Sequence, residues 1–307
     1  MVQIDLITGF LGAGKTTFIK RYAKWLERQG TSIAVIENEF GTAGLDAQTL
    51  RDTGLEVAEL SGGCICCGLA VDFHNSILAL AETCDRIIVE PSGIFSMDDF
   101  FDVVLSPQVK AVCQPGAVIT IVDPHSLDAM NAQDLEMLYG QLLCTGRVVL
   151  SKTDDLPQAR VEGAINTLQA LLASGHAAGR SIADIAESKP WDSFTDEDFA
   201  RMADSAPVWI PHEKQDINHA TLFNSATMYP EGAYTAEELA AIIDGITDGR
   251  CGAVLRIKGY VNAAQGGSLE VNCTAAERSI RACEYRKAGL NVIGRDLDRR
   301  GIRAAFG

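Results

Sequence analysis

Eight residues near the start of the chain, Gly9 to Thr16, match the pattern G-x-x-x-x-G-K-[ST] in full. They lie between a strand-like run, Val2–Ile7, and an amphipathic segment, Lys15–Arg28, whose spacing predicts a helix. In such a loop the glycines let backbone N–H groups point at phosphate oxygens, and the helix that follows directs the positive end of its dipole at the same charge. The sequence therefore predicts a loop that holds the phosphates of a nucleoside triphosphate.

Two side chains of this loop have separate predicted tasks. Lys15 is expected to reach the β- and γ-phosphates, and the Thr16 hydroxyl is expected to bind Mg²⁺. Glu90, at the end of an apolar run, is the expected second acidic group, holding Mg²⁺ through water. The N–H of Gly93 is expected to sense the γ-phosphate as part of a mobile loop. The residues predicted to bind the phosphates are Gly9, Gly12, Ala13, Gly14, Lys15, Thr16, Thr17 and Gly93.

The choice of base is predicted from Ser151, Lys152 and Asp154, which follow the apolar run Val148–Leu150. A carboxylate at Asp154 can accept two hydrogen bonds from guanine, one from N1–H and one from the exocyclic amine. Adenine offers no such pair of donors. Each charge-assisted bond is worth roughly 1.5–3 kcal/mol, so the motif favours GTP, although its usual first residue is Asn rather than Ser.

Three cysteines, Cys64, Cys66 and Cys67, lie within four residues and are flanked by glycines. Three thiols so placed can converge on one soft cation, with a carboxylate or water as the fourth ligand. A redox-active or structural cysteine group is the alternative. The other six of the nine cysteines are scattered and are interpreted as small buried apolar residues.

Composition excludes some classes of partner. The 307 residues carry 26 basic and 41 acidic side chains, a formal net charge of −15. Such a surface repels nucleic acid and anionic lipid, so neither is an expected partner. No apolar run approaches the roughly 20 residues of a membrane helix, and no signal peptide is recognisable, so a cytoplasmic location is expected.

The chain alternates short β-branched runs with longer amphipathic ones, which predicts an α/β fold with a mostly parallel sheet wrapped by helices. We expect a P-loop NTPase domain over residues 1–210, a linker over 211–220 and a small α+β domain over 221–307. The strands expected in the first domain are Val2–Ile7, Ser32–Glu37, Glu56–Leu60, Arg86–Glu90, Ala117–Asp123 and Arg147–Ser151, and its later helices are Val161–Leu172 and Asp192–Asp204. The second domain is expected to hold strands Leu222–Met228, Ala253–Val261, Ser268–Cys273, Ser279–Tyr285 and Leu290–Ile293, with a helix at Thr235–Ile246 and a short final helix.

Five motifs occur in a specific order: G-F-L-G-A-G-K-T, E-N-E-F-G, G-C-I-C-C, E-P-S-G and S-K-T-D. In this order the chain resembles the CobW-like metal-chaperone GTPases, a P-loop branch shared with the hydrogenase and urease nickel-insertion GTPases. Arg256–Tyr260 and Ile293–Leu297 resemble signatures of that family's C-terminal domain.

The resemblance implies a two-site switch. GTP and Mg²⁺ would order loops that shape the thiol site, and Glu37 would face both the Mg²⁺ and the thiolates as a metal ligand. Glu39 is the candidate for positioning the attacking water. The implied cargo is a transition metal, Zn²⁺ or Co²⁺, delivered to a metal-receiving client protein.

Two departures from the family pattern are present. Pro91 stiffens the second switch, and the stretch directly before the C-terminal domain holds only two histidines, His212 and His219, so bulk metal storage is not expected. Two other functions stay open: a P-loop kinase for a small metabolite, for which no Arg-rich lid is recognisable, and a non-hydrolytic metal buffer. Association into a homo-oligomer is also left open.

Overall fold

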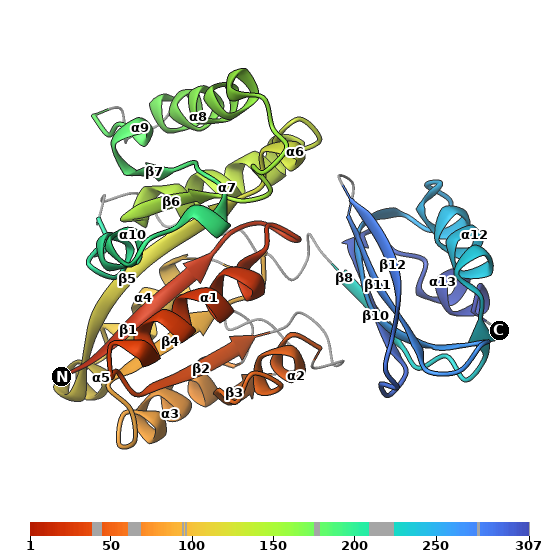
Figure 1. Cartoon of the computed structure of the whole chain (residues 1–307), viewed down its shortest axis with the longest axis horizontal. Coiled ribbons are helices and arrows are strands. Elements are labelled where there is room, and N and C mark those ends of the chain that lie inside the picture. The colour runs from red at the N-terminus through yellow and green to blue at the C-terminus, as the bar shows by residue number, and fades with distance from the viewer. Residues whose placement is uncertain are drawn as a thin grey trace. The chain divides into compact units, whose positions relative to one another are not determined.

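The computed structural model of the chain describes residues 1–38, 45–60, 69–93, 95, 97–174, 179–208, 224–274 and 277–306. These residues belong to two compact units, which are described one at a time. The first unit takes in residues 1–38, 46–60 and 69–208, and the second takes in 224–274 and 277–306 (Figure 1). The predicted linker, 211–220, lies outside the described residues.

The first unit is built on a parallel sheet. Its strands pair in the order β3-β2-β4-β1-β5-β6-β7, and every pairing is parallel. The predicted α/β fold with a parallel sheet is therefore confirmed. The strands are β1 (Val2–Thr8), β2 (Ile33–Asn38), β3 (Glu56–Leu60), β4 (Arg86–Glu90), β5 (Cys113–Val122), β6 (Arg147–Leu150) and β7 (Ala186–Glu187).

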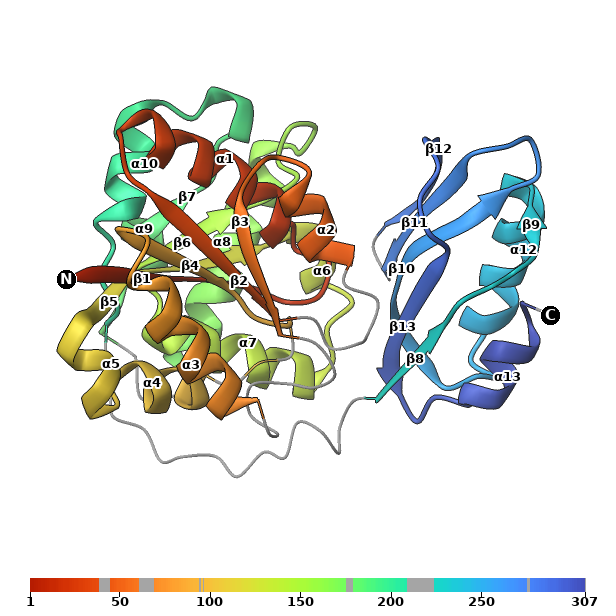
Figure 2. The ribbon, with the colours of Figure 1, turned by 90° about the horizontal axis from the view of Figure 1, so that it is seen from below.

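Helices cover both faces of this sheet, which is why its central strands are buried along most of their length. Figure 2 shows α1 and α10 on one face and α3, α4, α5 and α7 on the other. The helices are α1 (Lys15–Arg28), α2 (Leu45–Arg51), α3 (Ala70–Leu80), α4 (Met97–Val104), α5 (Pro107–Val112), α6 (Pro124–Leu127), α7 (Ala132–Cys144), α8 (Gln158–Ala173), α9 (Ile182–Ile185) and α10 (Asp196–Ala203), with a 3₁₀ turn, η2 (Trp191–Ser193).

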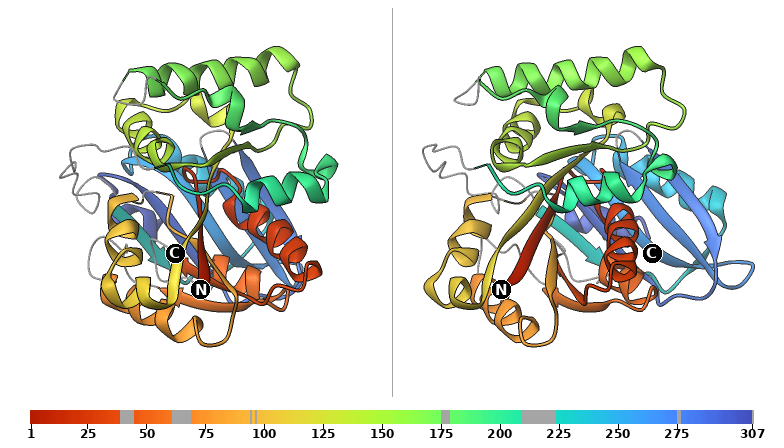
Figure 3. Two further views of the ribbon diagram at one scale, coloured as in Figure 1. Left: turned by 90° about the vertical axis from the view of Figure 1, so that its left-hand side faces the viewer. Right: turned by 60° about the vertical axis from the view of Figure 1, so that its left-hand side comes forward.

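Helix α1 has the bounds that the sequence predicts, and its ends have clear causes. It begins after Gly14, which adopts a left-handed conformation. It ends at Arg28, two residues before Gly30, which is also left-handed, and Gly30 N–H donates to Glu27 O while Thr31 N–H donates to Leu26 O. This pair of bonds is the Schellman arrangement that a glycine makes possible after a helix. Figure 3 shows α1, in red, running beside α10, in green.

One predicted helix of the first unit is wrong in its extent. Asp192–Asp204 is not one helix, because the chain forms η2 and then begins α10 at Asp196. Thr195 causes the late start. Its hydroxyl accepts from Asp198 N–H while its own N–H donates to the Asp198 carboxylate, and such a capping box fixes the first turn.

Strand β5 also differs from its prediction, since it begins at Cys113 rather than at Ala117. The segment around Pro115 and Gly116 looks like a turn in the sequence. It pairs with β1 all the same, and a register shift between Ile4 and Leu6 of β1 accommodates it.

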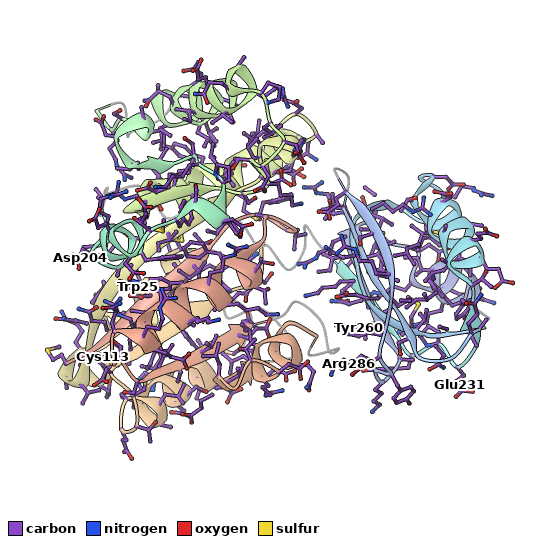
Figure 4. The ribbon with its side chains drawn as sticks, viewed as in Figure 1. Trp25, Cys113, Asp204, Glu231, Tyr260 and Arg286 are labelled. Carbon is purple, nitrogen blue, oxygen red and sulfur yellow. The ribbon has the colours of Figure 1, made fainter. Side chains whose placement is uncertain are left out.

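The second unit is an antiparallel sheet with strand order β12-β11-β10-β13-β8, and β9 pairs in parallel with one end of β10. Its helices α12 and α13 lie on one face of the sheet (Figure 2). Leu239, Ile243 and Ile246 of α12 pack there in a separate core. On β10, Tyr260 lies on the side of the sheet away from α12 (Figure 4). The elements are β8 (Asn224–Met228), β9 (Ala233–Tyr234), α12 (Ala236–Thr247), β10 (Ala253–Ala263), β11 (Ser268–Thr274), β12 (Arg278–Cys283), β13 (Gly289–Arg295) and α13 (Arg299–Ala304).

A buried polar group ties α1 to the sheet of the first unit. Asp5 of β1 accepts hydrogen bonds from the Tyr22 hydroxyl (2.8 Å) and from Ala117 N–H (2.8 Å), and Arg86 lies 3.4 Å from the same carboxylate. Arg86 also donates to the Tyr22 hydroxyl at 2.8 Å. Burial raises the pKa of Asp5 to about 6, although the charge of Arg86 and the hydrogen bonds from Tyr22 and Ala117 act in the opposite direction.

This raised pKa predicts a dependence of stability on pH. Since the pKa of Asp5 in the folded chain is above its ordinary value of 3.8, its contribution to stability is complete below pH 4 and is lost as the pH rises through 6. Asp5→Asn removes that titration. Between pH 4.5 and pH 7.5, the unfolding free energy of the variant should therefore gain about 2 kcal/mol relative to that of the original chain. Urea unfolding at both pH values measures this difference. A difference that does not change with pH would show that Asp5 stays ionised throughout.

Candidate nucleotide site

The predicted phosphate loop joins β1 to α1 and has the backbone that its glycines allow. Gly9, Gly12 and Gly14 have φ angles of 141°, 77° and 100°, a region that side chains other than glycine rarely adopt. Gly9 is also fixed by space, because a Cβ there would lie 2.3 Å from the carbonyl oxygen of Ile121 in β5. Ala13 is buried, while Thr17 is exposed on the first turn of α1.

Lys15 and Thr16 hold their polar atoms at this loop. The Lys15 ammonium donates to Gly9 O at 3.0 Å and lies 3.4 Å from Phe10 O, so the charge is placed on the loop itself. The Thr16 hydroxyl donates to Glu90 Oε1 at 2.7 Å. A hydroxyl and a carboxylate so close together form a set of hard oxygen donors, which suits Mg²⁺.

Glu90 ends β4, and the residues after it return to the phosphate loop. Pro91, Ser92 and Gly93 are buried. A Cβ at Gly93 would lie 2.6 Å from the backbone nitrogen of Leu11 and 2.9 Å from the carbonyl carbon of Phe10. The predicted second switch therefore starts in direct contact with the backbone that would surround the phosphates.

Glu37 lies on the strand next to Glu90. The parallel register pairs Glu37 of β2 with Glu90 of β4 on one side and with Glu59 of β3 on the other. Paired residues of neighbouring strands point to the same face, so all three carboxylates lie on the face that α1 covers. The last residue of β2, Asn38, donates from its side chain to Leu60 O at 2.9 Å and ties the ends of β2 and β3 together.

The predicted thiol ligands, Cys64, Cys66 and Cys67, lie outside the described residues, as does Glu39, the predicted water-positioning residue. Within the ranges that the structure describes, no group of three or more His, Cys, Asp or Glu side chains is arranged to hold a metal ion. In those same ranges, each helix is too short or too polar to cross a membrane.

The predicted base-recognition residues follow β6, and Ser151 among them lies near the phosphate loop. Ser151 N–H donates to Val122 O at 2.8 Å, and the Ser151 Cβ is 3.8 Å from the position that a Cβ on Gly14 would take. Lys152 has a φ of 53°, which is unfavourable for a side chain of this kind. This backbone angle turns the chain at the end of β6, and Asp154 is exposed just beyond the turn.

Two residues of this site were not predicted from the sequence. Asp123, at the end of β5, is buried and pairs with the Lys152 ammonium at 2.9 Å, which holds the strained turn in place. An acidic residue after an apolar strand was the available signal. Trp191 of η2 lies beside Gly14, with an indole carbon 3.3 Å from the position of a Cβ there. The sequence around Trp191 carries no periodic pattern from which its position could be predicted, because the strand before it, β7, has only two residues.

All these groups meet at one edge because the strands are parallel. The phosphate loop follows β1, Glu90 ends β4, Glu37 lies next to the end of β2, and Ser151 follows β6. Ligands of parallel α/β sheets bind at the edge formed by the carboxyl ends of the strands. At this edge the structure brings together the Lys15 ammonium, the Thr16 hydroxyl and the Glu90 carboxylate, a set of groups whose chemistry suits a phosphate and a divalent cation.

Comparison with known proteins finds a family model and several chains that are similar to this one. The family model described as "CobW/HypB/UreG, nucleotide-binding domain" matches residues 3–176. The chain is 33% identical over 164 residues to "Zinc chaperone YjiA" of Escherichia coli, and 30% identical over 188 residues to "Zinc chaperone CobW" of Pseudomonas aeruginosa. Each alignment covers 50% of this chain and 50% of the relative, so the chain spans about half the length of the curated relatives it matches. Among solved structures, that of Zn(II)-bound YjiA GTPase from E. coli aligns with this chain at 20% sequence identity and a TM-score of 0.43. The alignment covers 99% of this chain and 98% of the YjiA chain.

The contact between Gly93 and the phosphate loop generates a prediction. Gly93→Ala adds a methyl group 2.6 Å from Leu11 N, so the loop or the switch must move, and nucleotide affinity should fall about tenfold or more. Gly163→Ala is the matched control, because a Cβ there has nothing within 4 Å and lies within α8. The control should keep its affinity and gain about 0.5–1 kcal/mol of stability. Calorimetric titration with nucleotide measures the affinities, and equal values for the two variants would contradict the contact.

Proposed function

Because the chain belongs to the CobW/HypB/UreG family of nucleotide-binding domains, we propose that it hydrolyses GTP and uses the nucleotide to control the binding and delivery of a transition metal ion. The observation that carries this proposal is the register of β2. It places Glu37 beside Glu90, whose carboxylate accepts from the hydroxyl of Thr16. The same register places Glu37 beside β3, and the cysteine stretch begins four residues after the last residue of that strand, Leu60. In this proposal the Glu37 carboxylate would lie between the nucleotide half and the metal half of the switch.

In the nucleotide half, Lys15 would neutralise the β- and γ-phosphates, and backbone N–H groups from Gly9 to Thr16 would surround them. The oxygen donors of Thr16 and Glu90 fit Mg²⁺, with Thr16 as a direct ligand and Glu90 acting through water. When bound, Mg²⁺ supplies positive charge against the phosphate oxygens. Asp154 would accept from guanine while the pair of Lys152 with Asp123 keeps the turn in position. Glu39 would position the attacking water.

In the metal half, Cys64, Cys66 and Cys67 would supply thiolates, and Glu37 would supply a carboxylate. Thiolates with one carboxylate suit a borderline-soft cation such as Zn²⁺ or Co²⁺. The relatives are named zinc chaperones, which supports Zn²⁺ as the cargo. A related chain of Schizosaccharomyces pombe, 28% identical over 166 residues, is named a zinc-regulated GTPase metalloprotein activator, which supports a client protein as the receiver.

Coupling between the halves would run through the backbone. Gly93 lies against Leu11 of the phosphate loop, so a change at the γ-phosphate would displace the segment that begins at Glu90. Glu37 is the register partner of Glu90 and would respond to that change. Such coupling must be reciprocal: if GTP tightens the metal, the metal tightens GTP by the same factor.

Phosphate release distinguishes this proposal from its two rivals. The purified chain should release phosphate from GTP in preference to ATP, at a rate that Zn²⁺ or Co²⁺ alters. Asp154→Asn should weaken GTP binding about tenfold or more, through the loss of a charge-assisted pair, and should spare xanthosine triphosphate. A preference for ATP without a metal effect would favour a small-metabolite kinase, and no release at all would favour a metal buffer.

A titration of metal tests the coupling itself. Competition with a chromophoric chelator should give tighter Zn²⁺ binding with GTP than with GDP, by roughly 5- to 150-fold, because allosteric coupling energies commonly have this size. Lys15→Ala is the control: it should bind nucleotide poorly and give the same Zn²⁺ affinity under both conditions. Equal Zn²⁺ affinities in the unaltered chain would refute the switch.

A further inference from the structure

The segment between β7 and α10, residues 188–195, is held against α1 and is called the α1 strap here. Asp192 of the strap pairs with Arg21 of α1 at 2.7 Å, and the ring of Trp191 packs edge-on against Phe18 with centroids 5.7 Å apart. Just beyond the strap, Asp196 pairs with Arg28 at 2.9 Å. The strap is thus fastened to the helix whose first turn follows the phosphate loop.

Trp191 makes contacts with two different parts of the candidate site. Its indole N–H donates to the carbonyl of Leu150 at 2.8 Å, at the end of β6 and directly before Ser151. On the other side, carbon Cη2 of the indole lies 3.3 Å from the position of a Cβ on Gly14. The indole therefore fills the space between the end of β6 and the last glycine of the phosphate loop.

Gly14 is the position of the loop where such a contact matters most. It has a φ of 100° and directly precedes Lys15, the first residue of α1. Its peptide sets the direction of the N–H groups that open the helix, and those N–H groups bind phosphate in a loop of this kind. Without a side chain of its own, Gly14 depends on its neighbours to stay in place.

We propose that Trp191 is a positioning residue for the phosphate loop. Its indole holds Gly14 at a fixed distance from the end of β6, so the phosphate-binding N–H groups and the base-recognition turn keep one spacing. This inference rests on the proposed binding of GTP and adds to it a residue that acts through Gly14. The indole acts on the loop and not on the base, so its loss is felt by every nucleotide that carries the phosphates.

The chain offers a matched control on the same strap. Phe194 packs edge-on against Phe199 of α10 with centroids 5.7 Å apart, and it borders the same apolar core as Trp191. Removing either ring costs packing in that core. Of these two rings, the ring of Trp191 is the one that contacts both Gly14 and Leu150. Loss of stability alone therefore affects both variants, whereas loss of nucleotide affinity is specific to Trp191.

The test measures the affinities of GTP, GDP and inosine triphosphate for the full chain and for three variants, Trp191→Ala, Trp191→Phe and Phe194→Ala. Trp191→Ala should weaken all three nucleotides by a common factor of about ten or more, as expected when a binding group is misplaced by about 1 Å. Trp191→Phe keeps an apolar ring beside Phe18 but loses the bond to Leu150 and the outer indole carbons that reach Gly14, so its loss of affinity should be smaller than that of the alanine variant. It also carries the test if the alanine variant does not fold. Phe194→Ala should keep the affinities of the unaltered chain.

The outcomes separate this inference from the proposed function. If Trp191→Ala and Trp191→Phe bind like Phe194→Ala, the inference is overturned while the proposed function stands. If Trp191→Ala changes the ratio of GTP affinity to inosine triphosphate affinity, Trp191 acts on the base and the inference is also overturned. If the unaltered chain binds no guanine nucleotide, the proposed function fails and this inference fails with it.

Discussion

Parallel pairing of β1 with β4 on one side and with β5 on the other is the constraint on which the candidate site depends. Parallel strands all finish at one edge, so whatever follows each strand is brought to the same place. The phosphate loop, Glu90 and Ser151 come from three strands and meet there for this reason. Burial on both faces keeps the strands apolar and leaves the polar chemistry to their ends. The register then decides which polar residues become neighbours, and it makes Glu37 the neighbour of Glu90.

The phosphate loop is held from two sides by contacts of different kinds. Gly93 touches the loop backbone at Leu11, and this contact belongs to the segment that the sequence predicts to be a switch. Trp191 lies against Gly14 and is bonded to the end of β6. In the proposed switch, the first contact would transmit a change at the phosphates, and the second would keep the loop at a fixed spacing from the turn after β6. Both would be needed, since a loop without a fixed side would move as a whole and transmit little.

Charge is distributed unevenly along the chain. Residues 224–306 hold eleven Arg and Lys and ten Asp and Glu, so the 15 other basic and 31 other acidic residues lie outside that segment. The net charge of −15 therefore disfavours nucleic-acid binding by the first unit, but it says nothing against such binding by the second unit. In the first unit the register places Glu37 between Glu90 and Glu59, and Glu59 pairs with Arg51 at 3.2 Å.

The sequence by itself determined the phosphate loop, the parallel α/β class, the bounds of α1, β3 and β4, and the pairing of an acidic strand end with the loop. These follow from local rules: glycine spacing, apolar periodicity and the stop at Gly30. Only the tertiary structure decided that Glu37 lies beside Glu90, that Asp123 holds Lys152, and that Trp191 lies against Gly14. It also decided where α10 begins and that Ala186–Glu187 pairs as a strand. Each of these depends on register or packing between residues far apart in the chain, and a two-residue strand is too short to carry any periodic pattern.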